Sequence, residues 1–598
     1  MKLSVRLLAV AIASAFLLAC SGGGAGPSSG PTPPPPAAPG GFAAAAATSN
    51  SITLSWTASG SFSTYKIYRN GAEVATVPGP PFTDTGLTPG ATYQYFIRGV
   101  TPAGVLSAQS PTISATTSGG SNSLTLAALI DPAARSYMMV RDIEFDAAGD
   151  IFITGGAFSA NFPTTAGAYD RTFSSGGSST GSVGPSDVFV MKFNRAGQLI
   201  WSTLIGGPNH DRAYGLEIAP DGGVIVAGRA GEGFPTTAGV IQPNFAGDTA
   251  PNGAYGKQDG FVAKLSADGS QLLWSTYFGS SKAGALRDVG VDSNNKVYVV
   301  GAFFSGLAHI TGGAVQSSPN GQHDLVYARL NANATAVEYS TYLGGAEPNG
   351  ETPGTPSITV TPGREVFVVI EEGGTGAPTS SNAYQRNGAG GVDFLIAKFS
   401  PSDQLVYATY LGGGADEDLE THNLAVDGAG RAVVASISKS SNYPVTTGAY
   451  QQLYGGGSND GVISILSADG SSLVASTFFG GAGFEDLQGV EVSTDGRLYI
   501  AGGTASSGLH TTSDAFQTNF AGVADAFLAS LTTDLRTAPF VSYLGGTDSD
   551  IARAMDTASD GAVAFGGVTR SPNLPVSGGG STTPNGGATT GWWALKTP

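Results

Sequence analysis

The sequence has few charged residues, a single cysteine and no excess of basic residues. Charged residues make up 12% of the 598 residues, about half the usual share. The 28 Lys and Arg face 45 Asp and Glu, so the net charge is −17. Binding to a phosphate backbone needs a basic surface, and this composition therefore argues against a nucleic acid as partner. The one cysteine, Cys20, cannot form an intramolecular disulfide.

Long hydrophobic runs are also scarce, and the N-terminus holds the one clear example. Lys2 and Arg6 precede an apolar stretch over residues 7–19, too short for the roughly 20 residues that span a bilayer. The stretch fits the apolar region of a secretory signal. It ends in LLAC, with Cys20 followed by Ser21, and this resembles a bacterial lipoprotein signal. The resemblance implies a signal peptide over residues 1–20, lipidation of Cys20 and, from Ser21, an outer-membrane location. The alternative is an ordinary signal peptide with an incidental cysteine.

The residues that are abundant predict an all-β protein. Gly and Pro, 89 and 34 residues, form about a fifth of the chain, and 41% of the residues are hydrophobic. Residues 21–38 are a Gly/Ser/Pro-rich tether that would hold the folded part away from the membrane. Beyond it, short stretches with alternating polarity are separated by turn residues, which is typical of strands.

Residues 39–118 have the pattern of a small sandwich. Strands are predicted at residues 51–56 and 65–69, and Asn70-Gly71 is a favoured hairpin turn. Trp56 and the LTPGATY run from Leu87 to Tyr93 resemble the core tryptophan and the tyrosine corner of a fibronectin type III domain. Such a domain is an adhesive module or a spacer.

Residues 123–598 repeat one unit. The phrase LIWSTLIGG at Trp201 recurs as LLWSTYFGS, VEYSTYLGG, LVYATYLGG, LVASTFFGG and PFVSYLGG, at spacings of 65 to 73 residues. One unit predicts strands at 215–219, 224–227, 259–265 and 272–278, joined by two tight turns and one long loop. Four antiparallel strands per unit, seven times, describe the blades of a β-propeller.

The two ends of this region are complementary. The last unit ends at WWALK, which matches a third strand, and SLTLAALI at residues 123–130 matches a fourth strand without predecessors. We therefore expect the first strand to complete the last blade and close a seven-bladed ring. The units resemble the SBBP repeat of bacterial cell-surface proteins. The fourth unit, with Glu371 and Glu372, and the seventh depart from that pattern.

The long loops and the blade-to-blade connections fall at one end of the strands, and we expect binding there. An Asp opens the third strand in six units: Asp187, Asp259, Asp324, Asp393, Asp460 and Asp525. A second set lies near the starts of first strands: Asp142, Asp211, Asp288, Asp418, Asp486 and Asp550. These carboxylates are interpreted either as Ca²⁺ ligands or as caps for loop amides. The spacing of true calcium loops is absent, and no organic cofactor motif is present.

Three further features bear on chemistry. His210 lies beside Asp211, but no nucleophile elbow accompanies it. Aromatics of the recurring loop phrase around Phe162, Phe234 and Tyr443 would either stack on sugars or fasten the loop to its own blade. Unrepeated acids in the fourth unit are candidates for acid/base pairs: Glu347, Glu351, Glu371 and Glu372.

Two functions follow from these features, beside a third in which the protein is a structural element of an envelope or secretion assembly. The first is a non-catalytic lipoprotein of the cell envelope whose propeller binds a protein or a glycan on its long-loop face. The second is an extracellular glycan hydrolase or lyase with a site at the central opening.

Overall fold

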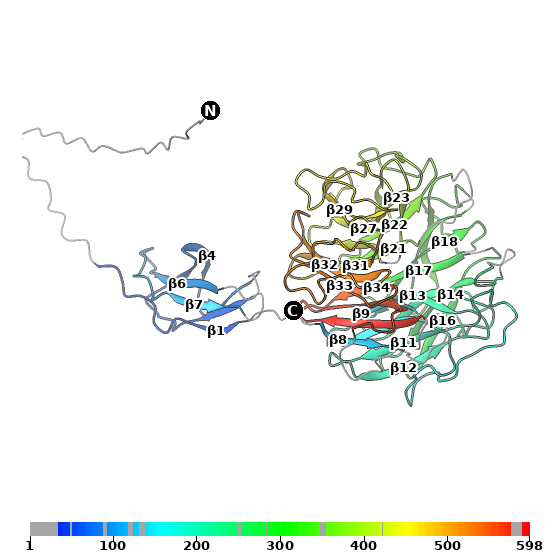
Figure 1. Cartoon of the computed structure of the whole chain (residues 1–598), viewed down its shortest axis with the longest axis horizontal. Coiled ribbons are helices and arrows are strands. Elements are labelled where there is room, and N and C mark those ends of the chain that lie inside the picture. The colour runs from blue at the N-terminus through cyan, green and yellow to red at the C-terminus, as the bar shows by residue number, and fades with distance from the viewer. Residues whose placement is uncertain are drawn as a thin grey trace, which may run out of the picture. The chain divides into compact units, whose positions relative to one another are not determined.

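The computed structural model describes residues 34–597 apart from 48–50, 86, 88–91, 118–123, 131–138, 248–252, 283, 308, 322, 347–354, 421 and 576–588. The regular elements of these residues are the strands β1 to β36, with no helix among them, so the predicted all-β class is confirmed. In the same residues, no helix offers a membrane-spanning segment. The chain divides into two compact units, Met1–Gly119 and Gly120–Pro598 (Figure 1). Cys20 and most of the tether lie outside the described residues.

The first unit contains two antiparallel sheets, of order β1–β2–β5 and β4–β3–β6–β7. Their bounds are β1 Ala43–Ala47, β2 Ile52–Ser55, β3 Thr64–Arg69, β4 Ala72–Val77, β5 Phe82–Asp84, β6 Thr92–Val100 and β7 Ile113–Thr116. Asn70 and Gly71 both have positive φ, as the predicted hairpin between β3 and β4 requires. Trp56 is 6% exposed and packs in the core with Leu87, as expected, while Pro89 and Gly90 lie outside the described residues.

In the described part of the second unit, the strands form seven antiparallel sheets. The first sheet consists of β9 Met139–Phe145, β10 Ile151–Ala157, β11 Asp187–Phe193 and β12 Leu199–Ile205, and the second of β13 Arg212–Ile218, β14 Val224–Ala230, β15 Asp259–Leu265 and β16 Leu272–Phe278. The third consists of β17 Gly284–Val291, β18 Val297–Phe304, β19 His323–Leu330 and β20 Val337–Leu343. The fourth consists of β21 Ser357–Val360, β22 Val366–Glu372, β23 Asp393–Phe399 and β24 Leu405–Leu411. The repeat therefore predicts the strands of each sheet within a few residues.

Sheets five and six complete the regular series. They are β25 Glu417–Asp418, β26 Leu424–Val426, β27 Ala432–Ser438, β28 Asp460–Leu466, β29 Leu473–Phe479; and β30 Glu485–Val492, β31 Arg497–Thr504, β32 Asp525–Thr532, β33 Phe540–Leu544. In the fifth sheet the first strand is broken in two, since β25 and β26 both pair with β27. The irregularity thus lies in the fifth sheet and in the short β21 of the fourth.

The seventh sheet joins the two ends of this unit. It consists of β34 Asp550–Thr557, β35 Val563–Thr569, β36 Thr590–Lys596 and β8 Leu124–Leu129. The last strand pairs antiparallel with β8, with Trp592 opposite Leu129 and Leu595 opposite Leu126. The strand predicted from residues 123–130 therefore completes this sheet, which has four regular strands despite its divergent sequence.

The first strands of the sheets (β9, β13, β17, β21, β26, β30 and β34) contact one another in order. The strand β34 of the seventh sheet contacts β9 of the first, so the series of contacts returns to its start. Apolar faces of neighbouring sheets pack together, as between the first and seventh sheets, where Phe193 lies 5.1 Å from Trp593 between ring centroids. Each sheet thus buries both faces against its neighbours.

Candidate functional site

The six aspartates predicted at third-strand starts all hold the loop that precedes them. Each is at most 2% exposed. In each, one carboxylate oxygen accepts a hydrogen bond from a loop amide, as from Ser174 to Asp187 at 2.8 Å and from Ala521 to Asp525 at 2.8 Å. The other four do the same: Asp259, Asp324, Asp393 and Asp460. The structure places them in six different sheets and does not bring them together.

The glycine that follows each fourth strand is explained by these aspartates. A Cβ on Gly279 would lie 2.5 Å from Asp259 Oδ1, and one on Gly545 would lie 2.3 Å from Asp525 Oδ1. A side chain at either position would collide with the carboxylate. The recurring Asp and the recurring Gly are thus two halves of one structural contact.

The second set of predicted aspartates divides into two groups. Asp211 and Asp550 accept hydrogen bonds from the Gly207 and Gly546 amides at 2.6 and 2.7 Å, which closes the loop before the first strand. In the fifth and sixth sheets Glu417 and Glu485 do this instead, and Asp418 and Asp486 lie one residue later. Asp142 and Asp288 lie further along their strands, where the first strands converge.

The loop aromatics are structural. Phe162, Phe234 and Tyr443 are at most 5% exposed, and Phe234 lies 4.4 Å from Phe261 of its own sheet between ring centroids. Thr165 in the same phrase bonds to the outer strand, its amide donating to the Ser202 carbonyl at 3.1 Å. These residues fasten the long loop to its sheet, as one of the two interpretations predicted.

Five first strands carry a β-bulge at one equivalent position. The bulge leaves a single residue without a partner on the second strand: Arg141, Tyr214, Arg287, Gln488 and Arg553. Bulges redirect a side chain and are common beside active sites. Three of the five are arginine and the other two are tyrosine and glutamine, so the residue type is less uniform here than at the aspartate position. We call this set the bulge residues.

Four arginines surround the ring of Tyr214. Their guanidinium carbons lie 4.5 to 5.2 Å from its centroid: Arg287, Arg212, Arg141 and Arg229. The side chain of Tyr255 covers two of them, at 4.3 Å from Arg229 and 5.1 Å from Arg212. Tyr214 is 1% exposed, and Arg212 donates a hydrogen bond to its hydroxyl. Positive charge is therefore concentrated at one point of an acidic protein.

The pKa values of this cluster reflect that concentration. Burial raises the pKa of Tyr214, but the four arginines outweigh it and hold that pKa well below 10. Burial, with Arg212 and Arg553 nearby, lowers the pKa of Arg141 to about 9. Burial also lowers the pKa of Arg229 to about 9, together with Arg287 and Arg212. Tyr214 raises the pKa of both arginines, but it does not offset their burial and the repulsion between neighbouring guanidinium groups, which a bound anion would reduce.

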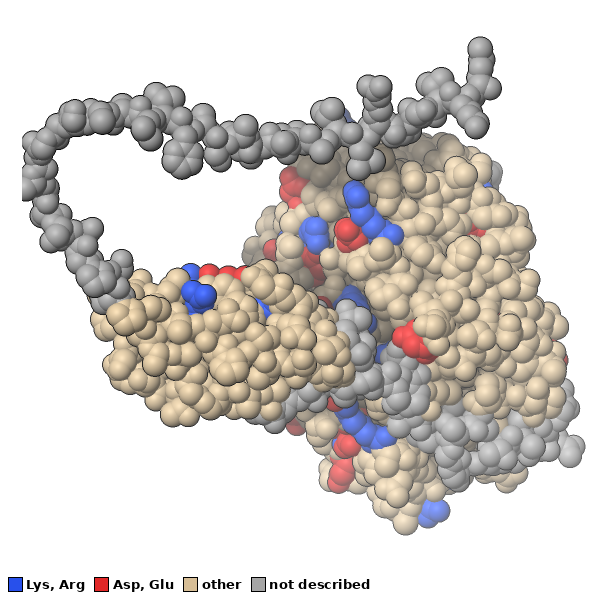
Figure 2. All heavy atoms as spheres, turned by 60° about the vertical axis from the view of Figure 1, so that its left-hand side comes forward, with Lys and Arg blue, Asp and Glu red and all other residues tan. Residues whose placement is uncertain are grey.

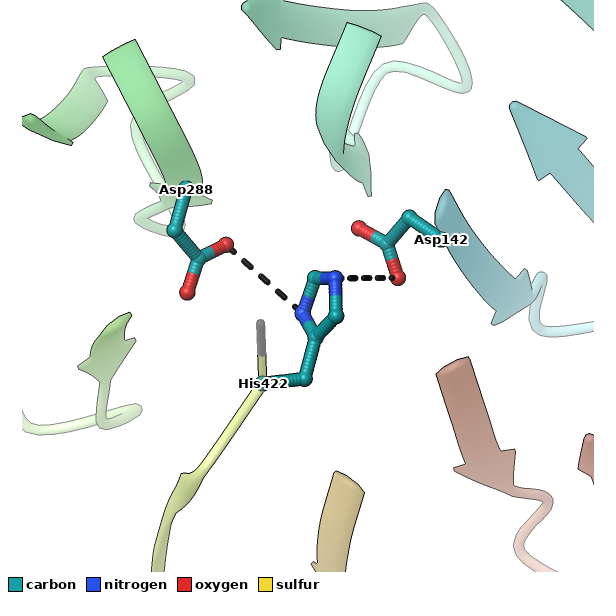
Figure 3. Close-up of side chains that lie close together, drawn as sticks. All are labelled: Asp142, Asp288 and His422. Carbon is teal, nitrogen blue, oxygen red and sulfur yellow. Dashed lines mark ion pairs between the residues drawn. The ribbon is translucent and has the colours of Figure 1, made fainter. Parts of the chain in front are cut away.

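His422 replaces a bulge residue in the fifth sheet. It lies in the break between β25 and β26, has a φ of 59°, and projects between Asp142 of β9 and Asp288 of β17 (Figure 3). Its Nε2 lies 3.4 Å from Asp142 Oδ1, and Nδ1 lies 3.9 Å from Asp288 Oδ1. Nε2 also lies 3.0 Å from the Arg141 carbonyl. Acceptors therefore face both nitrogens of the ring.

These three residues form the one group of described residues close enough to share a metal ion, with ligand atoms within 4.8 Å of one another. Their surroundings favour a protonated imidazole instead. Burial lowers the pKa of His422, but Asp142 and Asp288 more than offset this and raise it above 6.5. A nitrogen that donates to a carbonyl offers no lone pair to a metal. Both carboxylates are also engaged by backbone amides, those of Leu216 and Ile358 among them.

A second level of the same strands is acidic. Three residues after the bulge, four adjacent sheets carry an acid: Glu144, Glu217, Glu491 and Asp556. Burial and mutual repulsion raise the pKa of Glu217 to about 8 and that of Glu144 well above 4.5. Burial raises the pKa of Asp556 to about 6. The first strands thus present basic side chains toward their starts and acidic ones toward their ends.

The remaining candidates have structural partners. Glu372 accepts the Gly345 amide at 2.8 Å, and Glu371 accepts the Leu419 amide. Glu347 and Glu351 lie outside the described residues. His210 is fully buried, with Nδ1 3.0 Å from Ser186 Oγ and its ring 5.1 Å from that of Tyr255. It lies beside the arginine cluster, which sequence reasoning missed because arginines at 141, 212, 229 and 287 share no sequence motif.

Comparison with known families identifies the first unit. Residues 37–116 match the fibronectin type III domain model, so this segment belongs to that family. The match confirms the resemblance expected from Trp56 and the run from Leu87 to Tyr93.

Among characterised proteins, the chain is 43% identical over 70 residues to a poly(3-hydroxybutyrate) depolymerase of Ralstonia pickettii, which is 12% of this chain and 14% of that protein. It is 36% identical over 101 residues to exoglucanase B of Cellulomonas fimi, 16% of this chain and 9% of that enzyme. A longer match, 24% identical over 336 residues, is to the regulatory protein FlaEY of Caulobacter vibrioides. It covers 53% of this chain and 33% of that protein. The chain thus spans a third or less of these relatives.

Likeness to solved structures is weak. A protein of unknown function from Dyadobacter fermentans aligns with 79% of this chain and 98% of its own, at a TM-score of 0.36 and 12% identity. A PL25 ulvan lyase aligns with 74% of this chain over 92% of its own length, at a TM-score of 0.36 and 11% identity.

Proposed function

We propose that this protein is a non-catalytic, glycan-binding protein of the bacterial cell envelope. The observation that carries the proposal is the set of unrepeated bulge residues, with the arginines around Tyr214, where the first strands converge. The aspartate position holds the same residue in six sheets, whereas the bulge position varies between arginine, tyrosine and glutamine, and Arg141 and Arg287 meet at the ring of Tyr214. Local departures from a repeat are expected where a repeat protein binds its ligand.

The second unit is, in this proposal, a closed seven-bladed β-propeller of SBBP type. Support comes from the strand β8, which completes the sheet of β34 to β36, and from the contact between β34 and β9. Closure removes free sheet edges, which would otherwise invite association with other chains. It also fixes the first strands in a ring, so that residues from distant parts of the sequence meet.

The relatives support a glycan as ligand. Short matches of about the length of the fibronectin domain are to exoglucanase B and to chitinases of Streptomyces lividans and Niallia circulans. A fibronectin domain beside a glycan-directed unit is thus a shared arrangement, consistent with an extracellular or envelope location. A protein ligand on the long-loop face is the other outcome of the binding test.

The proposed anchor is a lipid on Cys20, with residues 21–38 as tether and the outer membrane as location. Replacement of Cys20 by Ser is expected to release the protein from membranes into the soluble fraction. Washed membranes and supernatants of cells that express each form are compared by immunoblotting. Retention of Cys20→Ser on membranes would refute the lipid anchor.

The binding proposal is tested with the purified full chain on a glycan array, with isothermal titration of each hit. We expect binding to at least one glycan class and no release of shortened products. Capture of a protein ligand with no glycan bound would overturn the glycan proposal.

One observation favours an enzyme at the same site. The arginines that hold the pKa of Tyr214 well below 10 make it a stronger candidate for a general base. A glycan lyase would use such a base beside cations that stabilise the developing charge. Release of unsaturated products by the full chain, abolished by Tyr214→Phe, would replace the binding proposal with this one.

A further inference from the structure

The arginines around Tyr214 form no ion pair with any carboxylate that the structure describes, in contrast to Lys192 and Lys264 of the same unit. Lys192 lies 3.0 Å from Asp146, and Lys264 lies 2.6 Å from Asp221. In the described part of the chain, no carboxylate oxygen lies within 4.0 Å of the side-chain nitrogens of Arg141, Arg229 or Arg287.

The same arginines leave donors unused. The Nε atoms of Arg141, Arg212, Arg229 and Arg287 are buried, and none has a hydrogen-bond partner in the described structure. Arg212, Arg229 and Arg141 are 2%, 6% and 8% exposed. A buried charged donor without an acceptor is costly, and proteins keep such groups where a ligand satisfies them.

The charge of the whole protein bears on the selectivity of this site. The face seen in Figure 2 bears few Lys, Arg, Asp or Glu side chains among uncharged ones. The protein as a whole is negative, at −17. The net negative charge disfavours a general affinity for anions, so an anion at this site would be held mainly by short-range contacts with the cluster.

We infer that the glycan bound at this site is acidic, and that its carboxylate or sulfate group is held by Arg141, Arg229 and Arg287. The inference rests on the proposed glycan-binding function and names the class of ligand. Guanidinium groups form paired hydrogen bonds with both kinds of oxyanion. The guanidinium carbons of Arg229 and Arg287 lie 5.2 and 4.5 Å from the centroid of the Tyr214 ring, and that of Arg229 lies 4.3 Å from the centroid of Tyr255.

The test measures binding of the full chain to three glycan sets of matched length: uronate-containing, sulfated and neutral. The variant is Arg287→Gln, because Arg287 is the partly exposed member of the cluster. The matched control is Arg536→Gln, which removes the same charge at a side chain that is 61% exposed. We expect at least a tenfold weaker affinity for the acidic glycan with Arg287→Gln and no change with Arg536→Gln.

The two acidic sets show which oxyanion the site binds. Tighter binding of the uronate-containing set indicates a carboxylate, and tighter binding of the sulfated set indicates a sulfate group. Arg287→Lys is a second variant, which keeps the charge but loses the paired hydrogen bonds. We expect its affinity for the acidic glycan to lie between those of the wild type and Arg287→Gln. Neutral glycans that bind equally well, or acidic glycans that bind Arg287→Gln as they bind the wild type, would overturn this inference and leave the proposed function standing.

A small-anion measurement keeps the two proposals separate. Thermal unfolding is followed in sodium sulfate and in sodium chloride of equal ionic strength, for the wild type and both Gln variants. If sulfate raises the melting temperature of the wild type and Arg536→Gln more than that of Arg287→Gln, the anion site is supported even where no glycan binds. Equal shifts in all three proteins would count against it.

Discussion

Residues that look alike in the sequence have different roles in the second unit. Asp525 is bonded to the amide of Ala521 at 2.8 Å and to the side chain of Gln517 at 3.0 Å, so its position is explained by its own loop. Asp142 and Asp288 instead face His422 from two other sheets. The environment of the carboxylate, rather than the residue type, separates the two roles.

The capping role predicts the effect of removing one carboxylate. Asp525→Ala removes the charged acceptor of the Ala521 amide and of the Gln517 side chain, and we expect a loss of about 1–3 kcal/mol in the free energy of unfolding. Asp525→Asn keeps an oxygen acceptor and is expected to cost less. Chemical denaturation with and without a calcium chelator measures both. A chelator that lowers the stability of the wild type as much as the Ala substitution does would favour the Ca²⁺ interpretation instead.

His422 predicts a pH-dependent contribution to stability. Its folded pKa lies above 6.5 because Asp142 and Asp288 outweigh its burial, so the contribution is complete below pH 6.5 and is lost as the pH rises through that raised value. His422→Asn retains a residue that tolerates positive φ and removes the charge. We expect it to cost about 1–3 kcal/mol at pH 5.5 and clearly less at pH 9, in denaturant titrations. A cost that does not change with pH would show that His422 contributes only through packing.

At the scale of strands, the repeat predicted most elements but not the bulges. The strand predicted at 259–265 is β15, and that predicted at 272–278 is β16. The strand predicted at 215–219 is β13, which starts earlier and contains the bulge at Tyr214. A bulge inserts one residue without a composition signal, because Arg, Tyr and Gln all occur in regular strands.

The strand β8 gives a prediction at this scale. Ala128 lies opposite Trp593 of β36, and the Ile130 amide two residues later donates to the Gly591 carbonyl, so the alternation of an antiparallel pair makes Ala128 a donor to β36 that proline would remove. Ala128→Pro is expected to destabilise the second unit by about 1–3 kcal/mol, whereas Ala128→Gly, which keeps the donor, costs about 1 kcal/mol or less. Calorimetry resolves the transition of the second unit from that of the fibronectin domain. Equal melting temperatures for the proline and glycine variants would mean that β8 contributes little to the seventh sheet.

For the whole molecule, buried acids predict that stability falls as the pH rises from about 4 to 8. The pKa of Glu217 is raised to about 8 and that of Asp556 to about 6, mainly by burial. The folded protein therefore keeps protons that the unfolded chain releases, and a state that binds more protons is favoured at low pH. Melting temperatures measured from pH 5 to pH 8 are expected to fall, and Glu217→Gln is expected to reduce the slope. The exposed Glu232→Gln is the control, and the prediction fails if both variants keep the slope of the wild type.

The sequence by itself determined the strands, the number of repeats and the role of the fibronectin domain's core residues, because these depend on local periodicity and on turn residues that act over a few positions. It also identified β8 as a fourth strand without predecessors. The arginine cluster was decided by tertiary structure alone. Arg141, Arg212, Arg229 and Arg287 come from three sheets and four strands, and only the order in which the sheets pack brings their side chains to one ring. Periodicity describes what each unit has in common, whereas this site is built from the positions at which the units differ.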